Sequence, residues 1–172
     1  EEGETLGIVG ESGCGKSTLA RMLVGLLPPS SGTIEINGEP LDNANPALFG
    51  RKIQYVFQDP ISSLNPRKTI QQIMEAPLKH LHNMPAKARA GRIREIFAAV
   101  NLREEFLDRY PHEFSGGQAQ RVGIARALAA DARILILDEP VSALDVSVQA
   151  QVLNLLADLK EQFGLTYLFI SH

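Results

Sequence analysis

The sequence of 172 residues contains little of what marks several specialised protein classes. A single cysteine, Cys14, excludes an internal disulfide and a zinc cluster built from cysteines, and it favours a reducing compartment. No apolar run approaches the roughly 20 residues that a transmembrane helix needs. If the protein works at a membrane, we therefore expect it to dock onto another chain.

Strong charge of one sign is also missing, because the net charge is only −3. Such a balance gives no overall field that would attract nucleic acid. Arg89, Arg92 and Arg94 are better interpreted as one charged helix face than as a nucleic-acid contact. His80 and His82 have no cysteine or carboxylate nearby at metal-ligand spacing, so a solvated helix face is favoured over a metal site.

A glycine-rich loop near the start of the chain carries the strongest signal. It fits the pattern G-x-x-x-x-G-K-[ST], in which glycines let backbone N–H groups point at phosphate oxygens. The apolar run 6–9 predicts a buried strand before the loop, and a helix is predicted to begin near Lys16. We expect Lys16 to reach the β- and γ-phosphates and Ser17 to ligate Mg²⁺. The predicted nucleoside triphosphate site comprises Gly10, Glu11, Ser12, Gly13, Cys14, Gly15, Lys16, Ser17 and Thr18.

The remaining pattern predicts an α/β fold with a mainly parallel sheet and a small antiparallel β portion. Strands are expected at 33–36, 52–57, 134–137 and 166–170, and a tight turn at 37–38. Helices are expected at 69–82, 86–100, after Ser115, and from a capping Asp145 to Gly164. The predicted division is an α/β core at 1–57 and 131–172 with a helical insertion at 58–130. The chain begins a few residues before the first predicted strand and ends directly after the last one, so we expect the core of a longer domain.

Two carboxylates, Asp138 and Glu139, close the apolar run at 134–137. At the carboxyl end of a parallel strand beside the phosphate loop, Asp138 could hold a metal through water. Glu139, one residue further, could polarise an attacking water. A charged pair that merely ends a strand is the alternative, and the phosphate loop favours the catalytic interpretation.

A second helix start occurs at Ser115-Gly116-Gly117-Gln118. Glycines are poor helix formers, so local stability does not explain this pair. An ordinary Ser N-cap followed by a flexible turn is one interpretation, and an anion site made of free N–H groups is the other. One nucleotide does not need two such helix starts. The second makes sense if it serves a nucleotide bound on another subunit.

Taken together, these motifs resemble the nucleotide-binding domain of ABC transporters, which is a P-loop NTPase core with an inserted α-helical subdomain. Six motifs occur in the family's order: the phosphate loop, Gln58, the 115–118 motif, the strand ending at Glu139, the 142–145 motif and the final Ser171-His172. The segments 58–67, 109–118 and 139–147 are most similar to ATP-binding subunits of oligopeptide and dipeptide importers. Their near relatives include nickel, glutathione and microcin importers.

The resemblance implies that ATP and Mg²⁺ bind and that ATP is hydrolysed in a head-to-tail dimer. It assigns catalytic roles to Lys16, Gln58, Glu139 and His172, metal contacts to Ser17, Gln58 and Asp138, and cross-dimer nucleotide contacts to Ser115, Gly116, Gly117, Gln118 and Asp145. The implied partners are a second ATPase subunit (identical or paralogous), transmembrane permease subunits and, indirectly, a solute-binding protein, without nucleic acid. The implied location is the cytoplasmic face of the inner membrane, where the subunit is peripheral.

Two other classes of protein share part of this pattern. A non-transporter ABC ATPase acting in DNA repair, chromosome organisation or translation is the nearer. Chromosome-type ATPases carry a long coiled coil between the phosphate loop and the motif at Ser115, but this sequence has no sustained heptad repeat there. The repair type carries cysteines that bind zinc, and this sequence lacks them. A GTP-dependent switch would need an Asn-Lys-x-Asp motif, and none occurs.

Overall fold

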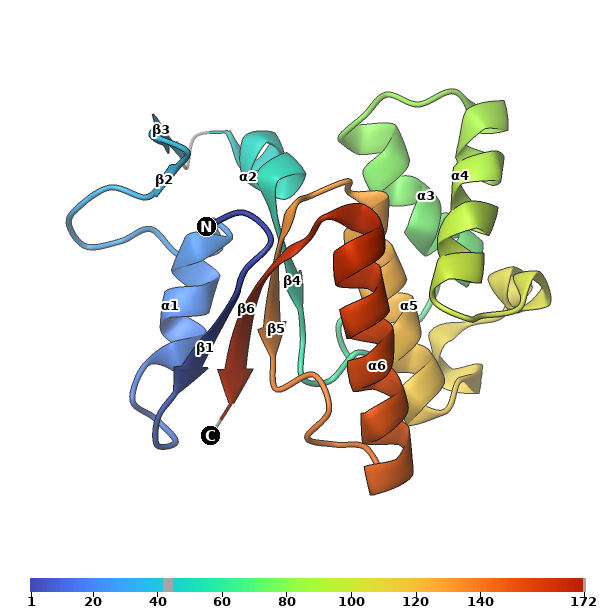
Figure 1. Cartoon of the computed structure of the whole chain (residues 1–172). Coiled ribbons are helices and arrows are strands. Elements are labelled where there is room, and N and C mark those ends of the chain that lie inside the picture. The colour runs from blue at the N-terminus through green and yellow to red at the C-terminus, as the bar shows by residue number, and fades with distance from the viewer. Residues whose placement is uncertain (42–44, 172) are drawn as a thin grey trace.

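A computed structural model of the chain describes residues 1–41 and 45–171 (Figure 1). Four parallel strands form the main sheet in the order β1-β6-β5-β4. Their bounds are β1 Thr5–Val9, β4 Ile53–Val56, β5 Ile134–Asp138 and β6 Thr166–Ser171. A small antiparallel sheet pairs β2 (Glu35–Ile36) with β3 (Glu39–Pro40). Between these two strands, Asn37 and Gly38 have φ values of 55° and 76°, which confirms the predicted tight turn.

Helices cover both faces of the main sheet (Figure 1). They are α1 Lys16–Leu23, α2 Pro46–Lys52, α3 Ile70–His80, α4 Ala86–Ala99, α5 Gly116–Ala129 and α6 Val146–Phe163, with short 3₁₀ helices η1 Glu104–Asp108 and η2 Pro111–Glu113. Thr69 and Ser115 begin α3 and α5 with capping boxes. Gly164 ends α6 in the left-handed conformation, as predicted.

Alternation along β5 divides the core into two clusters. Ile136 packs with Ala20 of α1 and Phe49 of α2 on one face. Leu135 and Leu137 face the other side, where the apolar residues of α5 and α6 lie. This second cluster continues without a break into α3 and α4, beyond α5. The expected strand covered on both faces is thus confirmed, and the division at 58 and 130 stays a proposal.

Two expectations from the sequence are wrong, and one helix was not predicted. The first strand is not buried, because β1 lies at the edge of the sheet with Leu6 62% and Val9 76% exposed. Asp145 occupies the N-cap position of α6, but its side chain makes no capping hydrogen bond. Helix α2 was not predicted, although Asn45 caps it and Pro46 stands at its first position.

Parallel pairing brings the carboxyl ends of the strands to one edge of the sheet. The loop after β1, Gln58 after β4 and Asp138-Glu139 at the end of β5 therefore come together there. In open α/β sheets this edge is where ligands bind. The fold thus places three of the predicted motifs side by side.

Candidate active site

The phosphate loop connects β1 to the first residue of α1. Gly13 and Gly15 have φ values of 83° and 100°, a region that side-chain-bearing residues rarely adopt. A Cβ on Gly10 would lie 2.8 Å from Cys14 Sγ, so the Cys14 side chain would have to turn away. No side chain caps α1, so its first N–H groups are left for a ligand.

Lys16 lies over this loop. Its amine donates to the carbonyl oxygens of Gly10 at 2.5 Å and Glu11 at 2.9 Å. The Cys14 sulfur lies 3.8 Å from the same nitrogen. The loop therefore holds the charged amine of Lys16, its only cationic side chain, where it can contact a bound anion.

Asp138 joins the end of β5 to the start of α1. Its Oδ2 accepts a hydrogen bond from Ser17 Oγ at 3.2 Å and another from the Tyr55 hydroxyl. Burial, followed by the bond to Asp138 and its charge, raises the pKa of Tyr55 well above its usual value. The phenol therefore stays protonated and acts as a donor. The sequence analysis did not find Tyr55, because its contact depends on how β4 is registered against β5.

Gln58 and Glu139 meet beside the loop. Gln58 Nε2 donates to Glu139 Oε2 at 2.9 Å and to Ser142 Oγ at 3.1 Å. The Ser142 hydroxyl in turn donates to the Glu139 carbonyl at 3.1 Å. Glu139 has a φ of 45°, a strained conformation for a residue with a side chain, and such strain concentrates at functional sites. Ser142 is a second contact that sequence reasoning missed.

These groups surround a cavity of about 500 Å³. Its lining consists of Ser12, Gly13, Gly15, Lys16, Ser17, Thr18, Gln58 and Glu139. The structure therefore brings together the loop, the glutamine and the expected general base. His172, which was expected to join them, lies outside the described residues.

The donor set fits Mg²⁺. Ser17, Asp138 and Gln58 offer oxygen atoms, which this cation prefers. Within residues 1–41 and 45–171, no group of three or more His, Cys, Asp or Glu side chains forms a metal cage. Mg²⁺ usually binds through one or two carboxylates plus substrate phosphates rather than such a cage.

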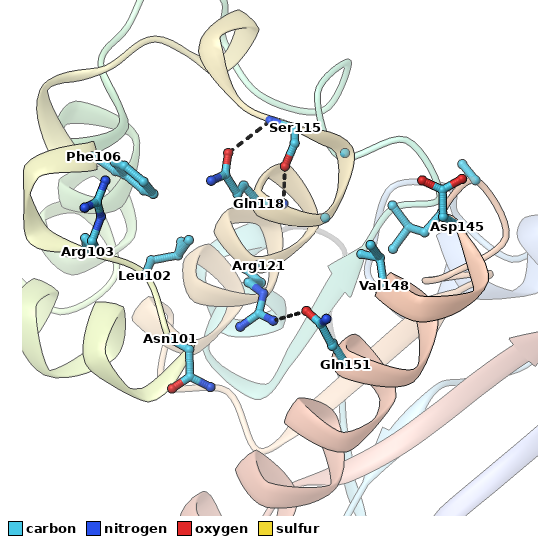
Figure 2. Close-up of a pocket in the computed structure, with 14 residues that line it drawn as sticks. Asn101, Leu102, Arg103, Phe106, Ser115, Gln118, Arg121, Asp145, Val148 and Gln151 are labelled. Carbon is cyan, nitrogen blue, oxygen red and sulfur yellow. Dashed lines mark hydrogen bonds between the residues drawn. The ribbon is translucent and has the colours of Figure 1, made fainter.

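The 115–118 motif faces a different hollow (Figure 2). This groove of about 740 Å³ lies between the starts of α5 and α6 and the segment 101–106. Ser115 Oγ accepts from the Gln118 N–H at 3.4 Å, and Gln118 Oε1 accepts from the Ser115 N–H at 3.1 Å. Asp145 lines the same groove.

Close packing explains both glycines of this motif. A Cβ on Gly117 would lie 2.5 Å from Val148 Cγ1, and one on Gly116 would lie 3.2 Å from Leu144 Cδ2. The turn is therefore tightly packed rather than flexible. The groove and the phosphate-loop cavity have no lining residue in common, so this chain does not itself bring Ser115 to the loop.

His80 is exposed, whereas His82 and the three arginines expected on a helix face have partners within the protein. His82 Nε2 lies 2.8 Å from the Ala130 carbonyl, which ties the end of α3 to the end of α5. The three arginines of α4 each lie within 4.0 Å of a carboxylate: Arg89 with Glu75, Arg92 with Glu95 and Asp131, and Arg94 with Glu104. These contacts support the charged helix face.

A phosphate loop after a parallel strand, with an acidic residue ending a nearby strand, defines a P-loop nucleotide-binding domain. Residues 1–142 match the family described as ABC transporter, and the chain belongs to that family. The resemblance drawn from the motifs is thereby confirmed.

Curated relatives narrow the comparison to transport proteins. The chain is 53% identical to the oligopeptide transport ATP-binding protein AppF of Bacillus subtilis, over 100% of this chain and 54% of that protein. It is 51% identical to the dipeptide transport ATP-binding protein DppF of Escherichia coli, over 100% of this chain and 52% of that protein. The chain spans about half the length of the curated relatives it matches.

Solved structures confirm the fold. The ATP-binding cassette MJ0796, in a dimeric post-hydrolysis state bound to ADP and Pi, is 35% identical with a TM-score of 0.86, over 100% of this chain and 76% of that one. CbiO1 of Clostridium perfringens, part of the ABC transporter complex cbiONQ, is 30% identical with a TM-score of 0.86, over 100% of this chain and 68% of that one. None of the helices in the described part of the chain has the length and apolar character that crossing a membrane requires.

Proposed function

We propose that this chain binds and hydrolyses ATP and thereby energises an ABC importer of peptides or related small solutes. The observation that carries the proposal is the convergence of the phosphate loop, Gln58 and Glu139 on one cavity. The similar proteins AppF and DppF, an oligopeptide and a dipeptide transport ATP-binding protein, support the solute class. They also favour transport over DNA repair or translation.

Each side chain has a role that its contacts support. Lys16 turns from the carbonyls of Gly10 and Glu11 to the β- and γ-phosphates, where its charge is needed. Gln58 and Glu139, joined at 2.9 Å, orient the attacking water, and the Glu139 carboxylate accepts its proton. Ser17 and Asp138 would hold Mg²⁺, which when bound neutralises charge on the phosphate oxygens.

A second subunit completes the site in this proposal. Ser115, Gly116, Gly117 and Gln118 would contact the γ-phosphate of ATP bound by the partner, with Asp145 at the interface. The separate groove at the start of α5 supports this arrangement, because a nucleotide on the chain's own loop would lie in the other cavity. The partner is an identical or paralogous chain, and His172 would touch the γ-phosphate. The dimeric cassette among the similar structures agrees with this assembly.

The proposed setting is the cytoplasmic face of the inner membrane. There the ATPase would dock peripherally onto permease subunits, and a solute-binding protein would act through them. Closure of the two ATPase subunits around ATP would be the motion passed to the permease.

Phosphate release from ATP tests the catalytic part of the proposal. Glu139→Gln removes the base while retaining an amide that can contact Gln58, and a loss of about 10²–10⁴-fold in rate is expected. Glu161→Gln is the matched control, because Glu161 is an exposed carboxylate on α6 remote in sequence from the motifs. Equal rates for both variants and the parent would refute Glu139 as the base.

A further inference from the structure

Tyr55 reaches Asp138, the proposed metal-binding carboxylate, from a neighbouring strand. Tyr55 lies opposite Ile136 in the β4–β5 register, and Asp138 follows Ile136 on the same face two residues later. The side chain thus extends along the sheet towards the edge where Asp138 lies. It is only 7% exposed, and its ring lies 4.4 Å from that of Phe57, which fixes its position.

Two hydroxyl groups converge on one oxygen of Asp138. Ser17 comes from α1, which covers this face of the sheet, and Tyr55 comes from β4. Both donate to Oδ2. Ser17 is itself an expected metal ligand, whereas Tyr55 is buried in the core and only donates a hydrogen bond to Asp138. Any cation that binds Asp138 through both oxygens must share Oδ2 with the Tyr55 hydroxyl, whose hydrogen bond occupies one lone pair and weakens that oxygen as a ligand.

Divalent cations differ in how they use carboxylates. Ca²⁺ takes six to eight oxygen ligands and often binds a carboxylate through both oxygens. Mg²⁺ demands octahedral geometry, keeps several of its waters and makes fewer direct contacts. A carboxylate with one oxygen engaged by a buried hydroxyl is therefore suited to Mg²⁺ and poorly suited to Ca²⁺.

We propose that the Tyr55 hydroxyl makes this site select Mg²⁺ over larger divalent cations, by keeping Oδ2 of Asp138 engaged and so opposing binding through both carboxylate oxygens. Tyr55 is a positioning residue, because it acts through Asp138. The inference rests on the proposed ATP site and adds a determinant of cation choice to it.

Binding of MgATP and CaATP, measured by calorimetry, tests this inference. The parent protein in this experiment is the full chain with Glu139→Gln, which does not consume ATP. It is compared with the same protein carrying Tyr55→Phe in addition. Phenylalanine keeps the ring beside Phe57 and deletes only the hydroxyl. Because one hydrogen bond to a charged group is lost, the affinity for CaATP relative to MgATP is expected to rise about tenfold. Affinity for ATP in the presence of EDTA should stay the same.

Tyr167→Phe in the same background is the matched control. Tyr167 is also a buried tyrosine, but its hydroxyl donates to the Leu156 carbonyl at 2.7 Å on the other side of the sheet. It should lower the stability without changing the cation preference. An unchanged preference in Tyr55→Phe, or an equal change in Tyr167→Phe, would overturn the inference. If the parent binds neither complex, the ATP site itself is refuted and the inference falls with it.

Discussion

Replacing Gly117 with alanine would place a methyl group where the start of α5 meets α6. The new carbon would lie 2.5 Å from Val148 Cγ1, whereas carbon atoms pack best at about 3.5–4.0 Å. Val148 cannot easily turn away, since a β-branched side chain in a helix has one strongly preferred rotamer. The two helices must therefore separate, or one side chain must adopt a poor conformation.

The magnitude follows from two opposing terms. Overpacking of this kind costs roughly 1–3 kcal/mol, whereas alanine in place of glycine stabilises a helix by about 1 kcal/mol. Gly91 in α4 provides the matched control, because a Cβ there would meet nothing within 4 Å. Gly91→Ala should therefore only raise the free energy of unfolding, through the higher helix propensity of alanine. The free energy of unfolding of Gly117→Ala should fall below that of Gly91→Ala by roughly 1–3 kcal/mol.

Urea unfolding of the two variants and the parent measures this difference. Adding Val148→Ala to Gly117→Ala should recover part of the loss, because it removes the atom that clashes. Equal stability of Gly117→Ala and Gly91→Ala would refute the packing explanation. The glycines would then have to be explained by ligand contacts alone.

Three further predictions concern other contacts. Cys14 is exposed beside Lys16, so alkylation of its thiol should block ATP binding, and MgATP should slow the alkylation. Equal rates of alkylation with and without nucleotide would contradict this prediction. Arg126→Met should lower the free energy of unfolding by about 1–3 kcal/mol, measured in urea, because it removes the bond to the Ser63 carbonyl and leaves that acceptor unpaired. Thr69→Ala should cost about 1 kcal/mol in the same assay through loss of the α3 cap, and no change would argue against that cap.

Local chemistry made much of the fold predictable. The capping residues Thr69 and Ser115, the glycine after α6 and the continuous apolar run of β5 each act over a few residues, so the sequence alone indicates their structures. Helix α2, which was not predicted, has a comparable signal in Asn45-Pro46. Its short length gave no helical period that could reinforce the cap.

Burial depends on neighbours that a sequence pattern does not reveal. The runs at 6–9 and 134–137 look alike, yet β1 lies at the edge of the sheet and β5 in its interior. For the same reason, the contact between Tyr55 and Asp138 follows only from the strand register. The phosphate loop was predictable because its chemistry is local, whereas the groups that position Asp138 and Gln58 come from separate strands and turns.

The shared site between two subunits is the central claim, and light scattering of the Glu139→Gln variant tests it most directly. With hydrolysis blocked, MgATP should convert the variant from monomer to dimer, and adding Ser115→Arg should abolish the dimer by filling the groove at the start of α5. Binding of ATP by the Glu139→Gln variant without any increase in mass, in the presence or absence of a paralogous ATPase subunit, would contradict the account.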